Sequence, residues 1–143
     1  MLRVRHLLDR KGREVWSVDA ETPVLEAIRM MAQRHCGALP VTRQGVLAGV
    51  VSERDYARKV ILMGRASADT PVAQIMSAPV VTVTADDPVR RCMELMTERR
   101  IRHLPVVGPD GTMIGMISIG DLVRAVIEEQ QATIEQLEKF ISG

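Results

Sequence analysis

The pattern of hydrophobic and polar positions occurs twice along the chain. Val18–Ile61 matches Val83–Ile127 with one inserted residue, so that Leu39-Pro-Val41 recurs as Leu104-Pro-Val106. Self-similarity over a segment of this size is typical of a supersecondary unit that cannot bury its apolar face alone. The two copies are therefore expected to fold together as one module.

Each copy predicts a strand, a helix, two strands and a second helix. In the first copy Val24, Ile28 and Met31 fall on one face of a helix, which Thr22 can cap with Pro23 at its first position. The corresponding residues of the second copy are Asp87, Pro88, Val89, Met93 and Met96.

Short apolar runs separated by glycine turns predict the strands. A second helix is expected to begin at Ser52 and at Ser118, and the first of these to end at Gly64. This order favours the α/β (α+β) class with a small mixed sheet in β-α-β-β-α repeats. The expected strands are Glu14–Val18, Ala38–Thr42 and Val46–Val51, then Val80–Thr84, Leu104–Val107 and Met113–Ile117.

The pattern divides the chain into a first repeat with its lead-in strand (1–64), a polar linker (65–71), a second repeat (72–128) and a C-terminal helical extension (129–143).

After Asp121 the pattern stays helical through Ile141, without proline or glycine. About 22 residues span roughly 33 Å, so such a helix overhangs a small domain. Apolar residues recur there at the spacing of a coiled-coil seam with one polar position. We therefore predict that the seam pairs with a second chain; the alternative is a helix that packs back onto its own module. The seam consists of Ile127, Gln130, Ile134, Leu137 and Ile141.

Composition and charge exclude several classes of function. Of the 143 residues, 46% are hydrophobic and 26% are charged, which is ordinary for a soluble globular protein. Lysine and arginine number 19 against 18 acidic residues, so the excess of positive charge that a duplex-DNA binder needs is missing. Aromatic residues are only 2%, too few for a platform that stacks single-stranded bases. No apolar run reaches the length of a membrane span, and no signal peptide is indicated, so a cytoplasmic protein is expected.

Motifs for metal binding and catalysis are also missing from the sequence. Cys36 and Cys92 lack the spacing of a disulfide framework or a zinc site, and His35 beside Cys36 has no second pair. The basic residues from Arg90 to His103 are interleaved with Glu94 and Glu98, as on a solvated helix face. Neither a Gly-x-Ser-x-Gly, a Walker loop nor a Gly-x-Gly-x-x-Gly occurs, so the sequence does not indicate an enzyme and requires no cofactor or metal.

Two segments carry a resemblance to a known family. Gly49-Val-Val-Ser-Glu-Arg-Asp55 is mirrored by Gly115-Met-Ile-Ser-Ile-Gly-Asp121, and the repeated Leu-Pro-Val precedes each, with Ile75-Met-Ser-Ala-Pro-Val-Val-Thr-Val83 between them. With two full copies in register, the chain resembles a tandem pair of cystathionine-β-synthase (CBS) domains, a Bateman module. It is similar to stand-alone bacterial CBS-pair proteins over about residues 1–128. The resemblance implies two repeats related by a pseudo-twofold axis.

The repeated Ser-x-x-Asp has two interpretations. On spacing alone it is a capping box, in which Ser52 or Ser118 caps a helix and the aspartate three residues later reaches back. By the resemblance, Asp55 and Asp121 hold the hydroxyls of a ribose and the serines contact ribose or phosphate. A carboxylate can accept both hydrogen bonds of a ribose diol, and a helix N-terminus suits phosphate. Both interpretations can hold at once.

The resemblance also implies which residues surround an adenosine ligand. The adenine would lie among apolar side chains and pair with the backbone of each leading strand, although for the valines a simple role in the strand core is the alternative. Arg54, beside Asp55, could clamp a phosphate or be a solvated first-turn residue. The implied adenine contacts are Trp16, Ser17, Val18, Gly37, Ala38, Val81, Thr82 and Val83, and the further phosphate contacts are Arg102 and His103.

In the family each cleft mixes the two repeats, which makes the two clefts chemically different. The Asp55 cleft would then include Val81, Thr82, Arg102 and His103, and the Asp121 cleft Trp16, Val18, Gly37 and Ala38. We expect the Asp55 cleft to favour phosphate charge and the Asp121 cleft to favour an uncharged extension.

The hypothesis from the sequence is a cytoplasmic regulatory module, not an enzyme, that binds an adenine nucleotide. AMP leads, followed by ATP, ADP, NAD and S-adenosylmethionine. The expected partners are a second copy, through the CBS helices and the C-terminal helix, and a protein not identified by the sequence, with no nucleic acid or membrane. The alternative is a ligand-independent dimeric assembly module; a regulatory half that acts on a separate catalytic chain is a more distant third.

Overall fold

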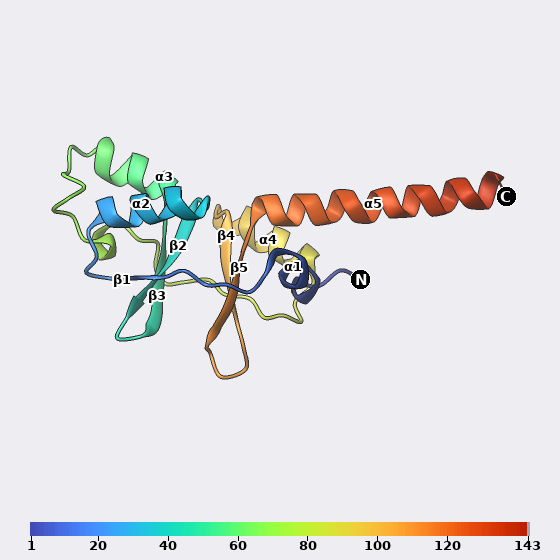
Figure 1. Cartoon of the computed structure of the whole chain (residues 1–143), viewed down its shortest axis with the longest axis horizontal. Helices are drawn as coiled ribbons and strands as arrows, with labels where there is room; N and C mark the ends of the chain where they lie inside the picture. Colours follow the sequence, from blue (N-terminus) through green and yellow to red (C-terminus); the bar gives the residue numbers. More distant parts are fainter. Residues whose placement is uncertain (143) are drawn as a thin grey trace. The chain divides into compact units, whose positions relative to one another are not determined.

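The computed structural model describes residues 1–142 and comprises two compact units (Figure 1). The first-repeat unit is Val15–Val81. The second-repeat unit combines Met1–Glu14 with Thr82–Gly143. The N-terminal residues, which the pattern assigns to the first repeat, therefore fold with the second.

The first-repeat unit is built on a three-stranded sheet, in the order β1 (Val18–Asp19), β2 (Ala38–Arg43) and β3 (Val46–Ser52). Strand β1 is parallel to β2, and β3 is antiparallel to it. Gln44 and Gly45 both have positive φ, as a tight hairpin with a primed turn requires. The helical segments of this unit are α2 (Val24–Arg34), α3 (Glu53–Tyr56), the π-helical turn Ala57–Ile61 and the 3₁₀ turn Val72–Gln74.

The core of this unit is formed by the residues that the hydrophobic pattern places inside. Leu39 and Val41 of β2 and Val51 of β3 are fully buried, and helix α2 packs Val24 and Met31 against them. The segment that the sequence treats as a linker belongs to this unit. Its carbonyls at Ser67 and Thr70 accept hydrogen bonds from the first N–H groups of α2 at 3.0 and 2.8 Å.

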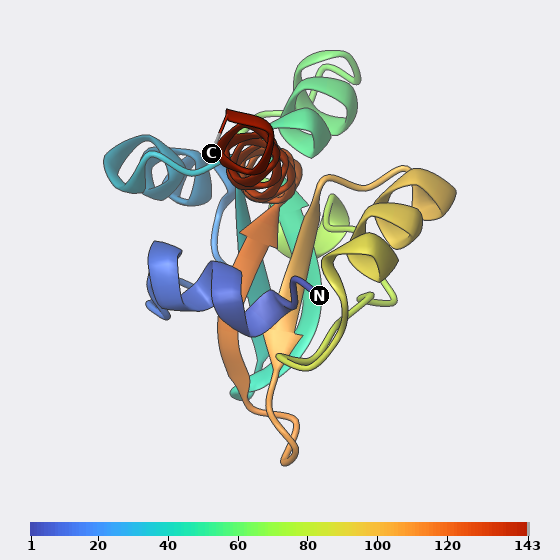
Figure 2. The same cartoon turned by 90° about the vertical axis from the view of Figure 1, so that its right-hand side faces the viewer.

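The second-repeat unit has the antiparallel pair β4 (His103–Val107) and β5 (Met113–Ser118), followed by α5 (Ile119–Ser142). Helix α4 (Val89–Arg99) corresponds to α2. The additional helix α1 (Val4–Lys11) lies across β5, as Figure 2 shows. It is held by Leu8, which is fully buried, and by backbone hydrogen bonds from Val4 to Asp87 and from Arg5 to Ala85.

Several element boundaries differ from those predicted by the sequence. The lead-in strand expected at Glu14–Val18 is reduced to Val18–Asp19, and the one at Val80–Thr84 to a single bridge between Val83 and Val106. Strand β1 pairs with β2 at Val41 and Thr42, and the second lead-in segment bridges β4 at Val106.

The helix boundaries also shift. Pro23 and Pro88 have extended backbone and immediately precede α2 and α4, so they do not occupy the first helical position and Thr22 and Asp87 are not the caps. The helix after Ser52 ends at Ile61, not Gly64. Helix α1 is not predicted by the sequence.

Helix α5 is the longest element and changes character along its length. Leu122 in its first turns is fully buried, and this end contacts α1, α4 and β5. From Glu128 to Ser142 every side chain is exposed. The expected helical extension is therefore confirmed, and its apolar seam is unoccupied within this unit. No helix among residues 1–142 is long and apolar enough to cross a membrane.

Gly49 and Gly115 occupy equivalent positions in β3 and β5, where another segment passes too closely for a side chain. A Cβ at Gly49 would lie 2.8 Å from the Ser77 carbonyl oxygen and from the Met76 sulfur, and one at Gly115 would lie 2.6 Å from Leu8. These contacts explain why glycine recurs at this point of the repeat.

We predict that Gly49→Ala lowers the free energy of unfolding by about 1–3 kcal/mol, because the Ser77 backbone cannot move as a side-chain tip can. Gly120→Ala is the matched substitution: its Cβ meets nothing closer than 3.6 Å, and it should stabilise α5 by about 0.4–1 kcal/mol. Urea denaturation of both variants tests this. Equal stability of Gly49→Ala and the wild type would contradict the close-approach explanation.

Candidate functional site

Each repeat has a serine and an aspartate that bond to each other where a strand becomes a helix. Ser52 Oγ accepts a hydrogen bond from the Asp55 N–H at 3.1 Å, and Asp55 Oδ2 accepts one from the Ser52 N–H at 3.0 Å. Ser118 and Asp121 repeat this arrangement at 3.2 and 2.8 Å. The capping interpretation of Ser-x-x-Asp is therefore confirmed, and the same bonds orient the two carboxylates.

The residue after each serine is held in an equivalent way. The Glu53 N–H donates to the Gly37 carbonyl at 3.0 Å, and the Ile119 N–H donates to the Arg102 carbonyl at 2.9 Å. Gly37 and Arg102 therefore each hold the start of a helix through their backbone carbonyls.

Asp55 is balanced by a cation from its own helical segment. Its side chain is only 13% exposed, and Oδ1 lies 3.1 Å from the Lys59 ammonium, which also donates to the Ile75 carbonyl at 2.9 Å. Arg54 points outward and is exposed. The Asp55 carboxylate is thus an acceptor whose free side is covered by one movable ammonium.

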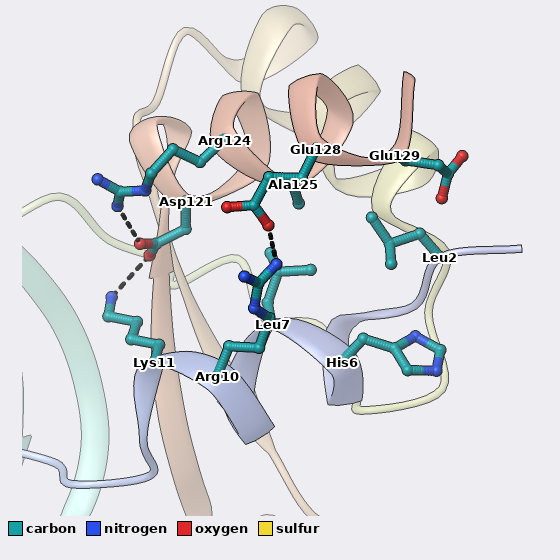
Figure 3. A pocket seen from close by; sticks show the side chains of 10 residues that line it. All are labelled: Leu2, His6, Leu7, Arg10, Lys11, Asp121, Arg124, Ala125, Glu128 and Glu129. Atoms are coloured by element: carbon teal, nitrogen blue, oxygen red, sulfur yellow. Dashed lines mark hydrogen bonds and ion pairs between the residues drawn. The ribbon is translucent and has the colours of Figure 1, made fainter. Parts of the chain in front are cut away.

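Asp121 is balanced by cations from two elements. Lys11, at the end of α1, donates to Asp121 Oδ2 at 2.7 Å and to the Met116 carbonyl at 2.8 Å, while Arg124 reaches Oδ1 at 3.0 Å (Figure 3). Burial of the Asp121 carboxyl raises its pKa, but the hydrogen bonds from Lys11 and Ser118 and the charge of Lys11 outweigh this effect. The pKa of Asp121 therefore lies below its ordinary value of 3.8.

Sequence reasoning missed Lys11 and Arg124. Lys11 is separated from Asp121 by 110 positions and lies in a helix that the hydrophobic pattern did not predict, so no local signal links them. The sequence predicts that the Asp55 cleft favours phosphate charge and the Asp121 cleft an uncharged extension. Lys11 and Arg124 are relevant to this prediction, because both lie within 3.0 Å of the Asp121 oxygens. The Asp121 site therefore also contains cationic side chains, which are paired with Asp121 itself and with Glu128.

A cavity of about 590 Å³ lies between α1 and the first turns of α5, with Asp121 at one end (Figure 3). Leu2, Leu7 and Ala125 supply its apolar lining. Its polar rim includes an ion pair between Arg10 and Glu128, shown as a dashed line in the figure. All of these residues belong to the second-repeat unit. The cavity therefore brings the Asp121 carboxylate, three cationic side chains and an apolar surface together.

The residues expected around an adenine ring, and the further phosphate contacts, differ in their exposure to solvent. Val18, Ala38 and Val83 are buried in the cores of their units, so only their backbone could be offered to a ligand. Gly37, Val81, Thr82 and His103 are half-buried, and Ser17 and Arg102 are exposed. Trp16 is partly exposed, and the Arg34 guanidinium lies 3.5 Å from the centre of its ring.

The residues expected around the ligands are divided between the two units. Trp16, Ser17, Val18, Gly37, Ala38 and Val81 fold in the same unit as Ser52, Arg54 and Asp55. Thr82, Val83, Arg102 and His103 fold with Ser118 and Asp121. The clefts implied by the resemblance join residues of different units, so those pairings stay predictions.

The cysteines and acidic groups suggest no metal centre in the described part of the chain. Among residues 1–142, no three His, Cys, Asp or Glu side chains lie close enough to hold a metal ion. Burial, followed by the nearby charge of Asp87, raises the pKa of the Cys92 thiol to about 11. Cys92 is therefore a neutral, buried thiol at physiological pH.

Comparison with known proteins agrees with the repeat and its motifs. CBSX3, a mitochondrial CBS domain-containing protein of Arabidopsis thaliana, is 44% identical over 137 residues, which are 92% of this chain and 66% of that protein. The CBS domain-containing protein YhcV of Bacillus subtilis is 33% identical over 114 residues, or 80% of each chain.

A solved CBS-domain protein from Burkholderia ambifaria is 46% identical, with a TM-score of 0.85 over 90% of this chain and 96% of that one. The CBS domain family matches residues 4–61 and 72–128, and these ranges contain the two copies of the repeat. The chain therefore belongs to the CBS domain family and carries two CBS domains in tandem.

Proposed function

We propose that the protein is a regulatory module that binds adenosine-containing ligands through Asp55 and Asp121. The observation that carries this proposal is the doubled carboxylate: both aspartates are mostly buried, both are oriented by the serine three residues earlier, and both face a lysine. A glutamate at the same position would complete a capping box equally well. The retention of aspartate in both repeats favours a second role beyond capping.

The geometry suits the hydroxyls of a ribose. A carboxylate accepts several hydrogen bonds, and adjacent ribose hydroxyls present two donors at a fixed separation. A ligand would replace the lysine that now covers each carboxylate, while the serine N–H keeps the carboxylate in place. Ser52 and Ser118, together with Arg54, Arg102 and His103, remain the candidates for phosphate or ribose contacts.

One neighbour with the same fold was solved with adenosine-containing ligands. The CBS domain pair of protein MJ0100, which is 21% identical with a TM-score of 0.80, was solved in complex with 5′-methylthioadenosine and S-adenosyl-L-methionine. That likeness concerns the fold alone. For this chain we propose AMP first, then ATP, ADP, NAD and S-adenosylmethionine. The effect on a partner would be a population shift, because a ligand that binds one arrangement better favours it. A catalytic reaction is not part of the proposal.

The first test is a thermal-shift panel with these five ligands on the wild type, Asp55→Asn and Asp121→Asn. A ligand that binds only the folded state raises the melting temperature once its concentration exceeds the dissociation constant. We expect at least one ligand to raise the melting temperature of the wild type, and one asparagine variant to reduce that shift. Asparagine keeps a capping oxygen but loses half of the acceptor capacity that the diol needs.

Asp110→Asn is the matched control. Asp110 is an exposed residue of the β4–β5 loop, and its carboxylate accepts hydrogen bonds from the N–H and the hydroxyl of Thr112. Its variant should respond to ligand like the wild type. Absence of any shift at millimolar ligand, with protein checked to be free of carried-over nucleotide, would refute the proposal. A shift that both asparagine variants retain in full would place the ligand elsewhere.

A second candidate function, ligand-independent assembly, is favoured by the exposed seam of α5. Ile134 is 47% exposed and Leu137 is 55% exposed, although both are large apolar side chains. The flanking face carries Glu128, Glu129, Glu135 and Glu138 against Lys139, which opposes binding to an anionic membrane. We propose that the seam pairs with the same seam of a second copy. Isoleucine occupies each a position, and the d positions are Gln130 and Leu137. β-branched residues at a with leucine at d favour parallel dimers.

The prediction for assembly is that Ile134→Glu converts a dimer into a monomer in sedimentation experiments at micromolar concentration. A buried charge opposite its own copy costs more than the pairing gains. Ala132→Glu, on the opposite face of the same turns, should leave the dimer intact. A wild type that sediments as a monomer would contradict the seam pairing, and a dimer that persists in Ile134→Glu would place the interface elsewhere.

A further inference from the structure

The contact between Lys11 and Asp121 differs in kind from the one between Lys59 and Asp55. Lys59 follows Asp55 by one helical turn, so the ion pair itself joins no two elements, although the ammonium also donates to the Ile75 carbonyl. Lys11 is the last residue of α1, and Asp121 lies in the first turn of α5. The ammonium also donates to the Met116 carbonyl in β5. One side chain therefore joins the end of α1 to both β5 and α5.

The Asp121 carboxylate has little acceptor capacity left in this arrangement. Oδ2 accepts from the Ser118 N–H and from Lys11, and Oδ1 accepts from Arg124. The Ser118 bond starts the helix, so it is costly to break. Arg124 is 72% exposed and can turn into solvent. A ligand with two hydroxyl donors must therefore displace Lys11 to reach Oδ2.

The rest of α1 is held independently of Lys11. Val4 and Leu8 are fully buried, and the backbone N–H of Val4 bonds to Asp87 at 3.0 Å. Beyond Leu8 the end of α1 is held to α5 by two ion pairs, Lys11 with Asp121 and Arg10 with Glu128. Gly12 follows with a positive φ and no heavy atom near its Cβ position. Release of Lys11 would remove one of these two links, together with its bond to the Met116 carbonyl, and leave the beginning of α1 in place.

We propose that Lys11 is a latch on the Asp121 site, so that a ligand with vicinal hydroxyls binds there by displacing the Lys11 ammonium and thereby releases the last turn of α1. This inference rests on the proposed function and adds its regulation. The Asp55 site has no such latch, because its lysine belongs to its own helical segment. Ligand binding at Asp121 is thus the event that changes the surface formed by α1 and α5, including the cavity of Figure 3.

The test compares Lys11→Met with the wild type in calorimetric titrations with adenosine. Adenosine carries the hydroxyls but no phosphate, so a lost attraction between lysine and phosphate cannot mask the result. We expect Lys11→Met to bind adenosine about three- to tenfold more tightly, because no ammonium competes for Oδ2. Lys11→Arg should bind like the wild type, since the competing charge is retained.

Arg13→Met is the matched control. Arg13 lies two residues further along and pairs with Asp9 at 2.9 Å on the surface, away from Asp121. It removes one positive charge from the same segment without opening the latch. Its affinity for adenosine should equal that of the wild type.

Hydrogen exchange of the Gly12 amide distinguishes a latch from a purely structural lysine. If Lys11 had only a structural role, ligand binding would not change the exchange rate of this amide. This amide donates to the Leu8 carbonyl at 2.8 Å and so reports on the last turn of α1. We expect saturating adenosine to accelerate its exchange in the wild type by about three- to tenfold, opposite to the usual protection by a ligand. In Lys11→Met the exchange should already be fast without ligand, and in Arg13→Met it should behave as in the wild type.

The outcomes separate the two proposals. If the wild type binds adenosine and Lys11→Met binds it equally, with Gly12 exchange unchanged by ligand, the latch is wrong and the proposed function stands. If neither protein binds adenosine or AMP at millimolar concentration, the proposed function fails and the latch fails with it. Binding by Lys11→Met alone would support both, since the latch would then be closed in the wild type.

Discussion

The reciprocal hydrogen bonds between a serine and the aspartate three residues later organise each repeat. They end the hairpin strand, begin the following helix and hold a carboxylate at 2.8–3.0 Å from the serine N–H. Because each mostly buried carboxylate is bonded to this backbone N–H, its position is fixed relative to the main chain. The candidate site is therefore as rigid as the junction between strand and helix.

The two repeats use this junction in different electrostatic surroundings. Asp55 is neutralised within its own segment by Lys59, whereas Asp121 is neutralised by Arg124 and by Lys11 from a distant part of the chain. The lowered pKa of Asp121 is the result of attraction that exceeds the cost of burial. Two carboxylates with the same local geometry thus differ in what must move before a ligand can reach them.

Helix α5 connects this site to a surface that the second-repeat unit does not use. Its first turn holds Asp121 and the buried Leu122, Ala125 lines the cavity beside α1, and its remaining length presents apolar residues to solvent. Exposed Ile134 and Leu137 are costly in water unless another surface covers them. A stiff helix that begins at the proposed ligand site and ends in an apolar seam would link binding to assembly without any additional element.

The sequence by itself determined the repeat, the order of its elements and the Ser-x-x-Asp turns. These features are local: Leu39-Pro-Val41 and the glycine at 49 repeat at matched positions, and a cap is set by residues three apart. It also predicted the long C-terminal helix, because its seam has a regular spacing.

Only the tertiary structure decided where residues 1–14 fold, how short the lead-in strands are, and which cations meet each aspartate. Helix α1 buries Leu8 against Gly115, and this packing carries Lys11 to Asp121 across 110 positions of sequence. The physical reason is that a cap or a periodic seam depends on neighbours along the chain, whereas an ion pair depends on which surfaces the buried apolar residues bring together.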